Sequence, residues 1–148
     1  MSTFIKRDFI PDELKNVYVD FYWSQKKLWA LEMTVTELAI NELDWILDYP
    51  VWYMDPEPIP RMILKNQEQD SPHWNRIKAA DLNFPIHVLY WKNRLLILDG
   101  IHRLIKAKTS GATKIKTKIL SKGQILKILP TSDDFKTGFL KQFKQKEL

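Results

Sequence analysis

Apolar and polar positions along the chain fall into short periodic segments, which predict a mixture of strands and helices. The clearest strands are 86–91 and 94–98, and the two residues Lys92-Asn93 between them predict a β-hairpin. Residues 115–120 alternate between apolar and basic side chains, a pattern typical of a strand with one buried face. The weaker alternation at 17–22 and at 27–33 predicts two further strands.

Capping residues, prolines and glycines mark the ends of the expected helices. Helical segments are predicted at 11–14, 41–48 with Asn41 as its cap, 62–69, 71–82, 101–110 and 133–146. The prolines between residues 50 and 60 predict a loop, because proline fixes φ and lacks an N–H donor. This order contains too few βαβ units for a doubly wound sheet. We therefore expect an α/β (α+β) fold with a small mixed β-sheet and flanking helices.

The chain has 148 residues, enough for one core of ordinary size. We expect a single domain over 1–148, with a core at about 28–120, an N-terminal extension over 1–27 and a C-terminal amphipathic helix at about 133–146. No window reaches the ~18 apolar residues of a membrane span, and the N-terminus lacks a signal-peptide pattern. The absence of cysteine excludes disulfides, thiolate zinc sites and thiol catalysis, and is consistent with a cytoplasmic location.

The net charge of +5 comes mostly from the last third of the chain, where lysines are frequent after Lys114. A basic surface of this kind offers contacts to DNA phosphates. It is more often a solvated surface than a specific nucleic-acid site. DNA is therefore a possible partner that the charge pattern alone does not favour.

The turn at Asp99-Gly100 carries the strongest functional signal. A buried strand ends there and a helix begins at once, so the first N–H groups of the helix are unpaired and favour an anion. His102 and Arg103 add a proton-transfer group and a bidentate anion clamp at the same place. The sequence therefore predicts a phosphate or carboxylate site at this turn.

The central segment also resembles a known family. Its Phe84-Pro85-Ile86 strand start, its turn at 99–103, the helix through Ala107, Gly111 and the strand from Ile115 resemble the ParB/sulfiredoxin fold. The similarity covers roughly 28–120, with 35–43 similar to the opening strand and short helix of the family. The specific part is the DG-x-HR turn, which is most similar to that of the free serine kinases.

This resemblance implies a nucleotide as cofactor, either ATP/ADP or CTP, with Mg²⁺. Ile101 stands where sulfiredoxins carry their cysteine, so sulfiredoxin chemistry is excluded. The arginine-pair turn of ParB proteins and a clear downstream helix-turn-helix are lacking, which weakens a chromosome-segregation role. In the resembling kinases a glutamate of the upstream region serves as base, and Glu37 or Glu42 would correspond.

Candidate site residues follow from the turn and its expected neighbours. For nucleotide binding they are Asp99, Gly100, Ile101, His102, Arg103, Arg76 and His73. For catalysis they are His102, Asp44, Asp48 and Glu42. His73 and Arg76 share a helix face at i and i+3, and Asp44 and Asp48 do so at i and i+4. His87 is interpreted as a packing residue of a strand, and no metal-ligand cluster is expected.

The leading hypothesis is a nucleotide-binding domain that transfers phosphate to a small-molecule acceptor or hydrolyses it. Arg103 would clamp the phosphate, and His102 would bind it or relay a proton. One alternative is a non-enzymatic DNA-associated module that uses the lysine-rich strand and tail. Another is a protein–protein adaptor. Six tryptophans are more often packing residues than platforms for a base.

Overall fold

The computed structural model describes residues 10–52, 59–66 and 72–131, and its centre is a four-stranded mixed sheet. The strands are β1 (Thr36–Ala39), β2 (Ile86–Trp91), β3 (Arg94–Asp99) and β4 (Lys114–Leu120), in the order β1-β4-β2-β3. β4 runs parallel to β2 and antiparallel to β1, and β2 pairs antiparallel with β3. The predicted class, a small mixed sheet with helices, is confirmed.

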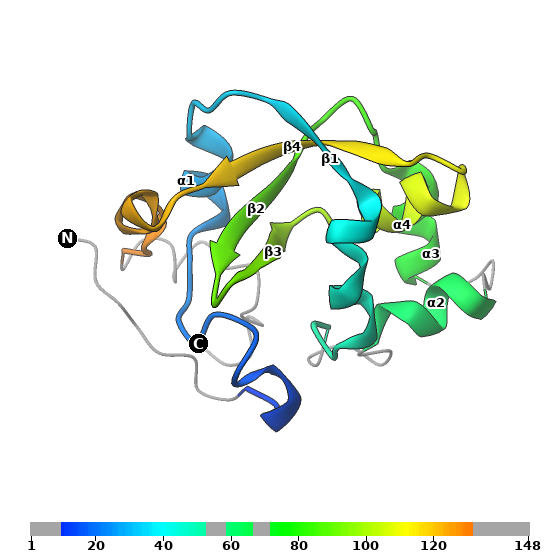
Figure 1. Cartoon of the computed structure of the whole chain (residues 1–148), viewed down its shortest axis with the longest axis horizontal. Helices are drawn as coiled ribbons and strands as arrows, with labels where there is room; N and C mark the ends of the chain where they lie inside the picture. The colour runs from blue at the N-terminus through cyan, green and yellow to red at the C-terminus, as the bar shows by residue number, and fades with distance from the viewer. Residues whose placement is uncertain (1–9, 53–58, 67–71, 132–148) are drawn as a thin grey trace.

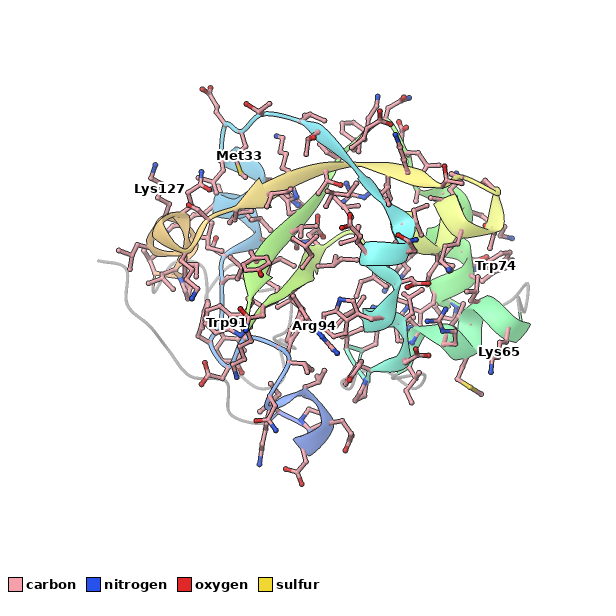
Figure 2. All side chains as sticks on the ribbon, viewed as in Figure 1. Met33, Lys65, Trp74, Trp91, Arg94 and Lys127 are labelled. Atoms are coloured by element: carbon pink, nitrogen blue, oxygen red, sulfur yellow. The ribbon has the colours of Figure 1, made fainter. Side chains whose placement is uncertain are left out.

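The hairpin of β2 and β3 forms as predicted. Lys92 and Asn93 both have positive φ, 48° and 65°, which is the left-handed conformation that a two-residue hairpin turn needs. Trp91 and Arg94 flank this turn, and Figure 2 shows them at the end of the hairpin. The Asp99-Gly100 turn therefore lies at the other end of β3.

Four α-helices accompany the sheet in the described ranges: α1 (Gln25–Ala30), α2 (Pro60–Asn66), α3 (Pro72–Ala79) and α4 (Ile101–Thr109). Figure 1 shows α2, α3 and α4 grouped together, with α1 on the other side of the view. Gly111, with φ of 80°, follows the end of α4 and confirms the predicted glycine at that position. Pro60 and Pro72 are each the first residue of a helix, where a missing N–H costs nothing.

Short 3-10 helices replace or extend the helical predictions. They are η1 (Asp12–Leu14), η2 (Ile40–Glu42), η3 (Asp44–Asp48) and η4 (Lys122–Ile128). The segment 41–48 is thus two tight turns rather than one α-helix, and Asn41 is not a cap. η4 was not predicted from the sequence, although the Ser121 N–H donates a hydrogen bond to Gln124 Oε1 (2.9 Å) at its start, as in a capping box.

Both strands predicted before residue 34 are wrong. Residues 17–22 form a turn and irregular chain with one isolated β-bridge at Phe21, and Tyr18, Val19, Phe21 and Tyr22 are all buried without periodicity. Residues 27–30 belong to α1, because the Ser24 side chain accepts a hydrogen bond from the Lys27 N–H (3.2 Å) and caps the helix. Contacts with the rest of the fold therefore override the local alternation.

The alternation predicted for β4 holds over its first half, since Ile115 and Thr117 are buried while Lys114 and Lys116 are exposed. It breaks at the end of the strand, where Ile119 is exposed and Leu120 is buried. The predicted helix at 133–146 lies outside the described residues. No helix within the described ranges is long and apolar enough to span a membrane.

Candidate functional site

Gly100 joins β3 directly to α4 in a conformation that demands glycine. Its φ is 120°, and a Cβ added there would lie 2.6 Å from the Cβ of Ile86. The first N–H of α4 that bonds the carbonyl of Gly100 is that of Leu104 (2.9 Å), and no side chain caps the helix at Gly100. The N–H groups of residues 101–103 therefore precede the first intrahelical bond, as the sequence analysis expects.

Asp99 is the buried centre of a polar network at this turn, with 5% of its surface exposed. Its Oδ2 accepts hydrogen bonds from Trp29 Nε1 (3.0 Å) and Arg103 Nη2 (2.9 Å). Its Oδ1 accepts one from Gln25 Nε2 (3.3 Å). The carboxylate thus ties α1 to α4, and its charge is balanced by the Arg103 guanidinium.

Arg103 is largely engaged within the protein. Besides Asp99, it donates from Nη1 to the carbonyl oxygens of Phe84 (3.2 Å) and Pro85 (2.6 Å). A guanidinium has five N–H donors. The Nε–H and one Nη2–H therefore lie outside these bonds. Arg103 therefore holds the segment before β2 in place and keeps only two N–H donors for a ligand.

A cavity of about 500 Å³ opens beside this network. Its lining residues are Trp29, Asp81, Phe84, Pro85, His87, Arg103 and Lys118. Trp29 and Phe84 are 52% and 65% exposed, which is unusual for aromatic residues. The wall thus combines accessible aromatic surface with two cations and one exposed carboxylate. We call this space the turn cavity.

His87 is a site residue that the sequence analysis interpreted only as packing. It is 5% exposed, and neither ring nitrogen has a hydrogen-bond partner among the described residues. Its Nδ1 lies 3.8 Å from Asp99 Oδ2, because position 87 of β2 pairs with position 99 of β3. The two-residue turn of the hairpin predicts the register from Trp91 and Arg94 as far as Val88 and Ile97. The bulge between His87 and Val88 then shifts the register by one residue, so the sequence carries only a weak signal for the pairing of His87 with Asp99.

His102 does not line the turn cavity. Its Nε2 lies 3.0 Å from His73 Nδ1, as the prediction of a shared site for these two residues requires. The Trp52 ring stacks on both imidazoles, with centroids 3.8 Å from His73 and 4.9 Å from His102. Arg76 is exposed and lies outside the turn cavity. Ile101 buries its side chain, so only its backbone is available there.

The carboxylates predicted for catalysis lie elsewhere. Asp44 pairs with Lys108 (3.0 Å), which is about 9 Å along α4 from His102 at 1.5 Å per residue. Asp48 pairs with Arg61 (2.8 Å). Glu42 is exposed, as is Glu37, which lies opposite Lys116 in the sheet. The structure therefore does not bring these carboxylates to the turn cavity.

The Asp48–Arg61 pair supports a prediction about pH. The Arg61 hydrogen bond holds the pKa of Asp48 below its ordinary value of 3.8, so the charged carboxylate stabilises the fold. That contribution is present above the ordinary pKa and disappears as pH falls through the lowered one. Because the Asp48 side chain is 61% exposed, we expect Asp48→Asn to cost less than about 1 kcal/mol at pH 7.

Urea unfolding of both forms from pH 7 to pH 3 measures this difference. The two forms should converge at the acid end. A difference that grows as pH falls would contradict the sign of the linkage.

Comparison with known proteins gives one structural likeness to report. No protein-family model matches the chain, and no curated protein matches it in sequence. The chain is similar to the crystal structure of a sulfiredoxin from Arabidopsis thaliana, with 18% identity and a TM-score of 0.36 over 62% of this chain and 91% of that one. That protein belongs to the fold family that the central segment resembles. At 18% identity and a TM-score of 0.36, the similarity gives no information about the activity of this chain.

Proposed function

We propose that this protein binds a nucleoside di- or triphosphate in the turn cavity. The observation that carries the proposal is the make-up of the cavity wall, where the exposed rings of Trp29 and Phe84 stand beside the cations Lys118 and Arg103. A volume of about 500 Å³ falls within the range typical of small-molecule sites. A nucleotide has the matching chemistry, a flat apolar base joined to a polyanion.

The wall suggests which part of the ligand faces which residue. Aromatic faces stack on a base, so Trp29 and Phe84 would take that end. Charged donors form short, strong hydrogen bonds to phosphate oxygens. Lys118 and the two remaining N–H donors of Arg103 would take the phosphates, near the start of α4.

Lys118 has a larger part in this proposal than the sequence analysis foresaw. The charge of Arg103 is balanced by Asp99, whereas Lys118 has no ion pair within the described ranges. Lys118 lies opposite His87 in the parallel pair of β2 and β4, so both side chains point to the same face of the sheet. It is the principal unbalanced charge available to an anion in the cavity, with Arg103 mainly a positioning residue.

A magnesium ion is compatible with this wall as a companion of the nucleotide. No cluster of three or more potential metal-ligating side chains occurs in the part of the chain that the structure describes. Mg²⁺ is commonly held by one or two carboxylates together with substrate phosphates. Asp81 lines the cavity and would supply one carboxylate, while the oxygens of Asp99 are engaged by protein donors.

The proposal is one of binding. Asp44, Asp48 and Glu42, the expected bases for phosphoryl transfer, do not line the cavity. The DNA-associated alternative retains one favourable observation, because the alternation of β4 directs Lys114, Lys116 and Lys118 to the same face. The experiment below distinguishes the two.

Calorimetric titration of the protein with ATP, ADP and CTP, with and without Mg²⁺, tests the proposal. Lys118→Ala should weaken nucleotide binding about tenfold, since it removes a charged contact to phosphate. Lys116→Ala is the matched control, because Lys116 lies two residues away on the same strand and outside the cavity. It should change the affinity less than twofold.

Two results would contradict the proposal. One is that the folded wild-type protein binds none of the three nucleotides at millimolar concentration. The other is that both lysine variants lose affinity equally. Steeply salt-dependent binding of DNA that declines in both variants would instead support the DNA-associated function.

A further inference from the structure

The position of His87 within the turn cavity leads to a more specific inference, which rests on the proposed function. We propose that His87 contacts the phosphate of the bound nucleotide through Nε2 while Asp99 orients its ring through Nδ1. The imidazole is doubly protonated in that complex, with one N–H directed to each anion. His87 is then a specificity-determining residue that distinguishes a nucleotide from its unphosphorylated nucleoside.

Burial is the first observation behind this inference. Buried side-chain nitrogens in folded proteins almost always have a hydrogen-bond partner. His87 is 5% exposed and has none at either nitrogen among the described residues, although it lines a cavity of ligand size. His87 lines the cavity while its two unsatisfied nitrogens are themselves covered, so a small ring movement would bring one of them to a ligand.

The second observation is the short distance to Asp99. A hydrogen bond from Nδ1 to Oδ2 requires a separation near 3 Å, and the two atoms lie 3.8 Å apart, so a ring movement of about 1 Å closes it. Oδ2 already accepts from Trp29 and Arg103, which hold the carboxylate in place. A fixed carboxylate at one nitrogen defines the orientation of the other, as it does for histidines in many functional sites.

Charged groups from several elements surround His87. Asp99 of β3 is the acidic group beside its Nδ1, and Arg103 of α4 and Lys118 of β4 are the basic groups of the same cavity wall. Asp81, before β2, is the remaining charged group of the wall, and the neighbouring α1 contributes Trp29 and Gln25, which carry no charge. A bound phosphate at Nε2 would face the Asp99 carboxylate across the ring, so each nitrogen would have an anionic acceptor.

Titration of the full-length protein with ADP and with adenosine tests this inference. His87→Leu removes both nitrogens at similar volume and should weaken ADP binding about tenfold, with adenosine binding changed less than twofold. His87→Gln keeps one donor but takes up no proton and should fall between. Tyr90→Phe, on the other face of the same strand, is the control and should bind both ligands as the wild type does.

Nitrogen-15 NMR spectra of the histidine rings supply the second readout. In the wild type, ADP should convert the His87 signals to the pattern of a doubly protonated ring, and adenosine should not. This measurement needs no variant, so it stands even where His87→Leu fails to fold.

The failures are distinguishable. ADP binding with normal affinity in His87→Leu, or a His87 ring that stays singly protonated in the wild-type complex, overturns the role of His87 and leaves the proposed function intact. A folded wild type that binds none of ADP, ATP and CTP overturns both.

Discussion

Replacing Gly100 with alanine is expected to lower the free energy of unfolding by about 3–5 kcal/mol. Two costs add at this position. The φ of 120° is a conformation that L side chains rarely adopt, and the new methyl group would overlap the side chain of Ile86. Ile86 is fully buried and begins β2, so it has no space into which to move. Equilibrium unfolding in urea, followed by tryptophan fluorescence, measures the change.

Gly111→Ala is the matched control for this experiment. Gly111 also has a positive φ, 80°, but a Cβ there would meet nothing within 4 Å. It should therefore show the conformational cost alone, about 1–2 kcal/mol. Equal losses in the two variants would show that the close approach to Ile86 contributes nothing. That result would contradict the packing of the turn described above.

Elements with strong local signals were predicted correctly. The β2–β3 hairpin follows from two apolar segments around Lys92-Asn93, of which Asn93 is a residue type that tolerates positive φ. The length of α4 follows from the glycines on either side of it, and β4 follows from its alternation. These signals lie within a few residues of the structure they specify, so tertiary context is not needed to interpret them.

The N-terminal region shows the opposite case. The alternation at 27–33 has the spacing of a strand, yet the Ser24 cap and the burial of Leu28 form α1. The indole N–H of Trp29 bonds to Asp99, seventy residues away in sequence. This contact holds α1 against the rest of the fold and so places Trp29 at the wall of the turn cavity. Interactions over such separations leave no periodic trace in the sequence.

The candidate site was likewise predicted in part. The strand-to-helix turn at 99–103 follows from a local pattern, whereas the contact of His73 with His102 joins two helices across 29 residues and was one of two open alternatives. The contribution of Lys118 and His87 depends on β4 lying parallel to β2 in register, a pairing between separate segments. The interpretation of Arg103 as a free clamp assumed that its charge had no partner, whereas Asp99 supplies one at i−4. The spacing of Asp99 and Arg103 in the sequence is compatible both with an ion pair between them and with an Arg103 that is free to bind an anion.

Breaking the Asp99–Arg103 pair is the second change expected to have a large effect. Asp99→Asn keeps the shape of the side chain but removes its charge, and should lower the free energy of unfolding by about 3 kcal/mol. The reason is that Arg103, 18% exposed, loses the counterion for a mostly buried charge, and the bonds from Trp29 and Gln25 meet a weaker acceptor. Arg103→Ala should cost a similar amount, since it leaves the Asp99 carboxylate buried without its cation.

A double-mutant cycle separates the pair from the other bonds of each residue. Arg103 also holds the carbonyl oxygens of Phe84 and Pro85, so its single variant loses more than the ion pair. The double variant should therefore be about 1.5–3 kcal/mol more stable than the sum of the single losses predicts. The pair Asp48–Arg61 has the same residue types at a similar distance, but its carboxylate is 61% exposed against 7% for Asp99, so its coupling should stay below about 1 kcal/mol. If the two couplings were equal, burial of the carboxylate would not be what makes the Asp99–Arg103 pair strong.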